Sequence, residues 1–122
     1  MEFTLNESVT DGLNIPVITL SGEIDLHSYV KMMAAINRHI AVETTRVIII
    51  NIITVSYIDS TGLGAIAKCA HHMQKKSGQV AIICTKPQII NLFEICKLTD
   101  KNVTIFETEA QAVHSLRSSL HQ

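Results

Sequence analysis

The chain lacks the residues on which several classes of binding site depend. It contains no tryptophan, and aromatic residues make up only 4% of its 122 residues. Such side chains build the platforms on which bases and sugar rings stack, so little is available here for either ligand. Charge is also nearly balanced, because ten basic and eleven acidic residues leave a formal net charge of -1. We therefore expect neither nucleic acid nor an anionic membrane as a partner.

Long apolar runs and paired cysteines are missing as well. No apolar run approaches the roughly 20 residues that a membrane-spanning helix needs, and the residues after Met1 lack the pattern of a signal peptide. Cys69, Cys84 and Cys96 form no C-x-x-C pair and are expected to be small buried side chains in a reducing compartment. These features predict a cytoplasmic protein.

The remaining composition is that of a compact globular protein. Hydrophobic residues make up 47% of the chain and charged residues 17%. This length is enough to bury a core, so we expect a single domain over residues 1–122.

Hydrophobic periodicity predicts strands that alternate with helices. The expected strands are residues 2–7, 15–20, 47–53, 80–84 and 103–106. The helices are expected to begin after a loop at 21–25, near Ser60, at Pro87 and after Thr108. Asp11-Gly12 is a turn signal that joins the first two strands into a hairpin. The pattern indicates an α/β fold with a mixed, mostly parallel sheet of about five strands, about four helices and an N-terminal β-hairpin.

The most informative stretch is the buried strand at 47–53 and the turn that follows it. Ser60 and Thr61 are two hydroxyl residues behind the carboxylate of Asp59, where a helix is expected to begin. Free backbone N–H groups and the positive end of the helix dipole collect at such a point. A phosphate on one of these hydroxyls would be held by the chain's own backbone. Asp59 can cap the helix, and it can also orient the Ser60 hydroxyl toward an incoming phosphoryl group.

No catalytic or metal-binding constellation is visible. Ser60 does not lie in a G-x-S-x-G elbow, and Asp59 beside it is not a triad. His71 and His72 are adjacent, so on a helix they point about 100° apart and cannot clamp one metal ion. Glu23 and Asp25 precede a helix, where acids usually act as caps. We expect no enzymatic activity, no metal and no cofactor.

A nucleotide-binding alternative rests on residues 62–67, which match G-x-G-x-x-A, with Gly62-Leu63-Gly64 as the turn. Three observations count against it. About eight residues separate the apolar run from Gly62, where the fingerprint requires a tight turn. No acid for a ribose hydroxyl follows the next strand, and a chain this short supplies little more than half of a dinucleotide site.

Residues 50–64, with Asp-Ser-Thr-Gly-Leu-Gly at 59–64, closely resemble the signature of bacterial anti-sigma factor antagonists, the STAS domain (sulphate transporter and anti-sigma antagonist). Residues 20–25 look like the family's second motif, and Pro87 to Leu98, which includes Phe93, resembles its third. Length and element order agree with the family over essentially the whole chain.

The resemblance implies a binding protein that is switched by phosphorylation. Its partner would be a serine-kinase anti-sigma factor with a histidine-kinase-like ATP-binding fold. The unphosphorylated antagonist would bind this kinase and release a sigma factor, phosphorylation would end the interaction, and a metal-dependent serine phosphatase would restore it. The resemblance places the phosphate on Ser60, with Thr61 as the second candidate. An alternative within the family is a scaffold or regulatory subunit that acts on a target other than a sigma factor. The implied partner-binding residues are Glu23, Asp25, Asp59, Ser60, Thr61, Gly62 and Leu63.

Overall fold

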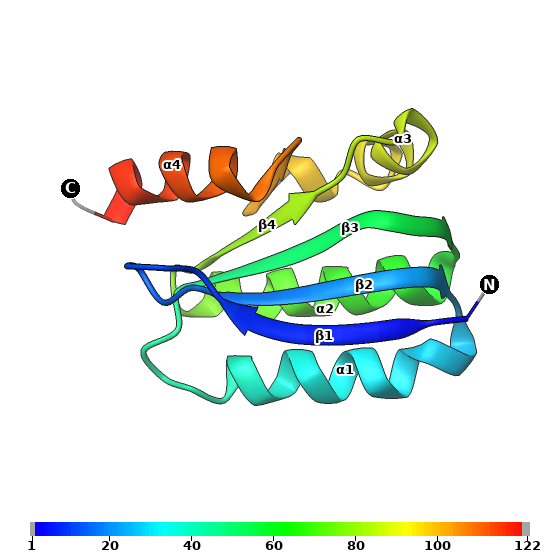
Figure 1. Ribbon diagram of the computed structural model, residues 1–122, viewed down its shortest axis with the longest axis horizontal. Helices are drawn as coiled ribbons and strands as arrows, with labels where there is room; N and C mark the ends of the chain where they lie inside the picture. The colour runs from blue at the N-terminus through cyan, green and yellow to red at the C-terminus, as the bar shows by residue number, and fades with distance from the viewer. Residues whose placement is uncertain (1, 121–122) are drawn as a thin grey trace.

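The computed structural model describes residues 2–120, with side chains described as far as residue 117. Strands and helices alternate after an initial hairpin, as predicted (Figure 1). In chain order the elements are β1 (Thr4–Val9), β2 (Pro16–Ile24), α1 (Leu26–Ile40), β3 (Val47–Ile58), α2 (Ser60–Lys75), β4 (Gln79–Ile83), α3 (Pro87–Ile95), a 3-10 turn (Leu98–Asp100), β5 (Val103–Phe106) and α4 (Glu109–Leu120).

The strands form one mixed sheet in the order β1-β2-β3-β4-β5. β1 runs antiparallel to β2, and the other neighbouring pairs are parallel. Gly12 lies in the hairpin turn with φ +82°, a conformation that glycine adopts without strain. The predicted fold class, including the N-terminal hairpin, is confirmed.

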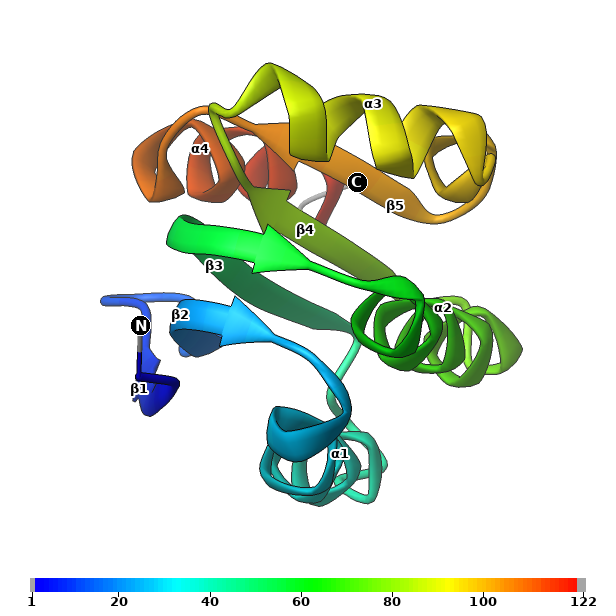
Figure 2. The ribbon, with the colours of Figure 1, turned by 90° about the vertical axis from the view of Figure 1, so that its right-hand side faces the viewer.

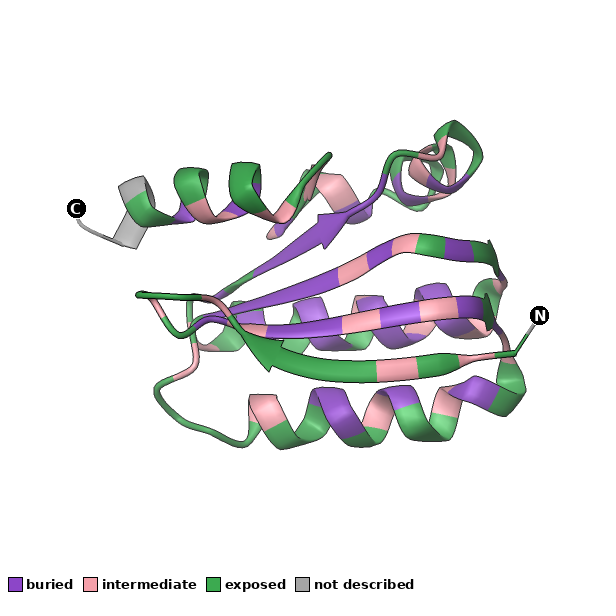
Figure 3. Cartoon of the chain, in the orientation of Figure 1, coloured by how far each residue is buried: buried purple, intermediate pink, exposed green. Residues whose placement is uncertain are grey.

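The helices cover both faces of the sheet and bury two apolar clusters (Figure 2). On one face, α1, α2 and α3 pack against alternate residues of the strands, such as Ile50 of β3. On the other face, α4 places Ala112 and Leu116 against Ile49 and its neighbours. Because β3 is covered on both faces, its first four residues are all apolar and buried, and burial is concentrated in the central strands (Figure 3).

Two strands are longer than predicted. The expected loop at 21–25 is strand as far as Ile24, and β3 ends at Ile58 rather than near residue 53. Pairing between β2 and β3 continues to the pair Ile24 and Ile58, across polar positions where Ser21 Oγ lies 2.6 Å from Thr54 Oγ1. The periodicity missed these segments because their polar side chains interrupt the apolar pattern, whereas backbone hydrogen bonds hold them in the sheet.

The cysteine prediction is correct for two of the three thiols. Cys69 and Cys84 are buried, and burial raises the pKa of Cys69 to about 12. Cys96 is exposed, so the expectation of burial is wrong there. It follows the last residue of α3, where the helix leaves the core.

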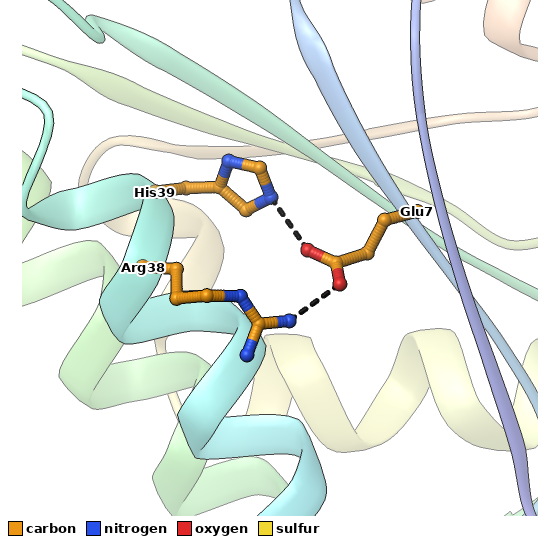
Figure 4. Close-up of polar contacts among 3 residues, drawn as sticks. All are labelled: Glu7, Arg38 and His39. Atoms are coloured by element: carbon orange, nitrogen blue, oxygen red, sulfur yellow. Dashed lines mark hydrogen bonds and ion pairs between the residues drawn. The ribbon is translucent and has the colours of Figure 1, made fainter.

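An ion-pair cluster ties the edge strand β1 to the last turns of α1 (Figure 4). Arg38 donates to Glu7 Oε2, and His39 Nε2 lies 2.9 Å from Glu7 Oε1. Desolvation by itself would raise the pKa of Glu7, but hydrogen bonds and charge from Arg38 and His39 outweigh it and lower that pKa. The cluster thus favours the ionised carboxylate.

Among the helices of residues 2–120, none combines the length and the apolar character that crossing a bilayer requires.

Candidate functional site

The site lies where the parallel strands β2 and β3 end side by side. Ile24 pairs with Ile58 at the end of the two strands, and the backbone N–H of Asp59 donates to the carbonyl of Ile24 at 3.1 Å. Asp25 and Asp59 each follow directly and precede α1 and α2. Two helix N-termini therefore meet at one edge of the sheet, which faces the viewer in Figure 2.

Asp25 caps α1, as expected for an acid before a helix. Its Oδ1 accepts from the backbone N–H groups of His27 at 2.9 Å and Ser28 at 3.2 Å. The Ser28 hydroxyl accepts in return from the Asp25 N–H at 2.8 Å, which completes a capping box. Glu23 does not share this role, because it lies in β2 and is exposed.

Asp59 caps α2, and Ser60 is the first residue of that helix. The Asp59 Oδ1 accepts from the Gly62 N–H at 3.0 Å, which confirms the predicted cap. Ser60 is exposed, whereas Thr61 is half-buried. The Ser60 residue is thus open to a second protein at a helix terminus, where the dipole and the first-turn N–H groups favour an anion.

Gly62 and Leu63 do not belong to the exposed surface of the site. A Cβ on Gly62 would lie 2.5 Å from Ile24 Cγ2 and 2.7 Å from Ile58 Cγ1, so this glycine allows α2 to pack closely on the strand ends. Leu63 is buried in the larger apolar cluster. The family resemblance implies that both residues belong to the partner-binding face, and in this structure both are buried.

The geometry also bears on the dinucleotide alternative. The eight or so residues between the apolar run and Gly62 are not a loop, because β3 reaches Ile58 and Asp59 alone joins it to α2. The prediction of a loose turn is therefore wrong. However, Gly62 lies inside α2 and is packed against Ile24 and Ile58, so it offers no open cradle for a pyrophosphate. Close packing of α2 on the strand ends therefore accounts for Gly62 without a nucleotide.

Two exposed apolar side chains lie close in sequence to the capping aspartates, and sequence reasoning missed both. Leu26 is 69% exposed at the start of α1, and Tyr57 is 54% exposed near the end of β3. Tyr57 pairs in register with Glu23, so it belongs to the same edge. The available signal was an apolar residue directly after Asp25 and an aromatic residue two positions before Asp59. We name the following set the Ser60 face: Glu23, Asp25, Leu26, Tyr57, Asp59, Ser60 and Thr61.

The charged side chains of the Ser60 face are three carboxylates, and two of them bind the chain's own backbone. Asp25 and Asp59 are engaged in capping, and Glu23 is exposed beside them. Within the described part of the chain, no three histidine, cysteine or acidic residues come together as a metal site. The arrangement suits recognition by another protein.

Comparison with known proteins shows the family and the fold of this chain. The family model described as STAS domain matches residues 8–112. A curated protein of Listeria monocytogenes, named anti-sigma-B factor antagonist, is 30% identical over 96 residues, which cover 79% of this chain and 81% of that protein.

Solved structures show the same fold. The anti-sigma factor antagonist SpoIIAA in its unphosphorylated form is 25% identical with a TM-score of 0.74, covering 95% of this chain and 98% of its own. The Bacillus cell fate determinant SpoIIAA in its phosphorylated form is 23% identical with a TM-score of 0.71, covering 94% of this chain and 99% of its own.

Proposed function

This chain belongs to the STAS domain family, and we propose that it is an anti-sigma factor antagonist switched by phosphorylation of Ser60. In its unphosphorylated state the protein binds an anti-sigma factor that is also a serine kinase with a histidine-kinase-like ATP-binding fold, and a sigma factor is released. Phosphorylation ends this binding, and a metal-dependent serine phosphatase reverses it. The protein itself has no catalytic role.

The observation that carries the proposal is the position of Ser60. It is exposed, it opens α2, and it directly follows the capping residue Asp59. The relatives support the proposal, because the Listeria protein is named an anti-sigma-B factor antagonist and SpoIIAA has a phosphorylated form. The supporting evidence is thus a hydroxyl in an accessible place within a family of regulators.

The physical basis of the switch is the charge of the phosphate. A phosphoserine carries about -1.5 to -2 charges at neutral pH. The N-terminus of α2 favours an anion, so the modification costs the fold little. In an interface shaped for a neutral hydroxyl, the same charge would be desolvated beside Asp25 and Asp59, which repel it. Binding is therefore lost while the domain stays folded.

Three variants test the proposal with the purified kinase. We expect Ser60→Ala to bind with nearly wild-type affinity and to accept no phosphate. Ser60→Asp should bind about a hundredfold more weakly, equivalent to roughly 2.7 kcal/mol. Ser115→Asp is the matched control, because Ser115 is an exposed serine on α4, and it should bind like the wild type.

Calorimetry gives the affinities, and mass spectrometry after incubation with kinase and ATP locates the phosphate. Equal affinities of the wild type and Ser60→Asp would contradict the switch, as would phosphate mapped to Thr61 or to another residue.

A further inference from the structure

The segment of β3 that leads to Ser60 has a strand partner on only one side. β4 ends at Ile83, and its pairing with β3 stops at Asn51. β3 continues to Ile58, paired there with β2 alone among the described strands. The edge of residues 52–58 that faces away from β2 therefore needs other partners for its backbone groups.

This segment is also irregular. Between the pairs Thr19–Asn51 and Ser21–Thr54, β3 holds one more residue than β2, and it gains another between Val55 and Tyr57. Such bulges bend a strand and weaken the regular ladder. The position of the strand end consequently depends on contacts other than regular pairing.

Two side chains supply contacts on this free edge. Asn51 Oδ1 accepts from the backbone N–H of Ile53 at 3.0 Å, within β3 itself, and Lys86 reaches the edge from outside the strand. The Lys86 Nζ donates to the carbonyl of Ile53 at 2.9 Å and to the carbonyl of Val55 at 2.6 Å. Lys86 directly precedes α3 but makes no side-chain hydrogen bond to cap that helix. The lysine is half-buried, and both bonds are charge-assisted.

We propose that Lys86 is a positioning residue for the switch. Its ammonium group takes the place of a strand partner between the two bulges, and so fixes the end of β3 that carries Asp59 and Ser60. This inference rests on the proposed function, because its consequence is a Ser60 held in the geometry that the kinase recognises.

Lys76 provides a matched control at the far end of α2. Its Nζ also donates to two backbone carbonyls, those of Ile40 at 2.9 Å and Val42 at 3.0 Å, and it too is half-buried. It follows the whole length of α2, about 24 Å from the first residue of that helix. Removing this lysine deletes the same kind of interaction without touching β3.

The experiment compares Lys86→Met with Lys76→Met in the full chain. Hydrogen exchange should accelerate about tenfold at residues 55–59 in Lys86→Met and stay within about twofold of the wild type in Lys76→Met. The kcat/KM of the kinase for Ser60 should fall about tenfold in Lys86→Met only. Lys86→Arg keeps a cationic donor, so its exchange rates and its kcat/KM should both lie near those of the wild type. Lys86→Gln replaces Lys86→Met if that variant does not fold.

Unchanged exchange at residues 55–59 in Lys86→Met would overturn the inference, as would an equal loss of kcat/KM in Lys76→Met. A wild-type protein that the kinase does not phosphorylate would overturn the proposed function instead, and the exchange measurement would still decide whether Lys86 holds the strand.

Discussion

One aspartate caps the N-terminus of each of the two helices, α1 and α2, that begin at the Ser60 face. Asp25 accepts from two backbone N–H groups in the first turn of α1, and Asp59 accepts from one in α2. Each aspartate directly follows the end of a strand. The same two groups give the surroundings of Ser60 a negative charge. Asp59 therefore has a structural role, which is shown by its hydrogen bond, and a proposed electrostatic role toward a partner.

Substitution of Asp59 separates these two roles. Asp59→Ala removes the cap, and the free energy of unfolding should fall by about 1 kcal/mol. Asp59→Asn keeps a capping oxygen but not the charge, so its stability should stay near that of the wild type. Urea denaturation followed by circular dichroism measures both variants. An asparagine variant as unstable as the alanine variant would show that charge, not capping, is what matters there.

Strand β1 depends on side-chain contacts because it lies at the edge of the sheet and is exposed over most of its length (Figure 3). Leu5 packs on the larger core, while Glu7 reaches Arg38 and His39 on α1. The apolar contact and the ion-pair cluster both lie on the face of β1 that α1 covers. The strand is thus attached to one helix layer and leaves its other face open.

The lowered pKa of Glu7 predicts that the free energy of unfolding depends on pH. A carboxylate whose pKa is lower in the folded than in the unfolded state stabilises the protein above its unfolded pKa of 4.5, and this contribution is lost as the pH falls through the folded pKa. Glu7→Gln should therefore lower stability by roughly 0.5 kcal/mol at pH 7 and low salt.

The difference between Glu7→Gln and the wild type should vanish at acidic pH, and salt should reduce it. Denaturation curves at several pH values test this, with Glu94→Gln, an exposed acid on α3, as the control. A difference that persists unchanged below pH 3 would contradict an ionic origin.

The two apolar clusters lie on opposite faces of the same strands, so the molecule should unfold as one unit. Ile49 belongs to the smaller cluster and Ile50 to the larger one, although they are neighbours in β3. Loss of packing on either face therefore loosens the sheet on which the other face depends.

Leu116→Ala tests the coupling from the α4 side. Leu116 is buried in the smaller cluster, so its truncation should cost about 2–4 kcal/mol through lost burial and a cavity. Calorimetry should still show a single transition at a lower temperature. Ser115→Ala, at the exposed neighbouring position, should change little. A separate early transition of α4 would contradict cooperative unfolding.

The sequence by itself determined the order of the elements and the helix starts at Asp25 and Asp59. It also determined that Ser60 directly follows a capping residue. These features are local, because hydrophobic periodicity and helix capping act over a few neighbouring residues. Only the tertiary structure decided where β2 and β3 end, since the polar positions before their ends are held by hydrogen bonds between segments about 34 residues apart. It also decided that Gly62 faces Ile24 and Ile58 and that Lys86 reaches β3. Such contacts join distant segments, and no local pattern encodes them.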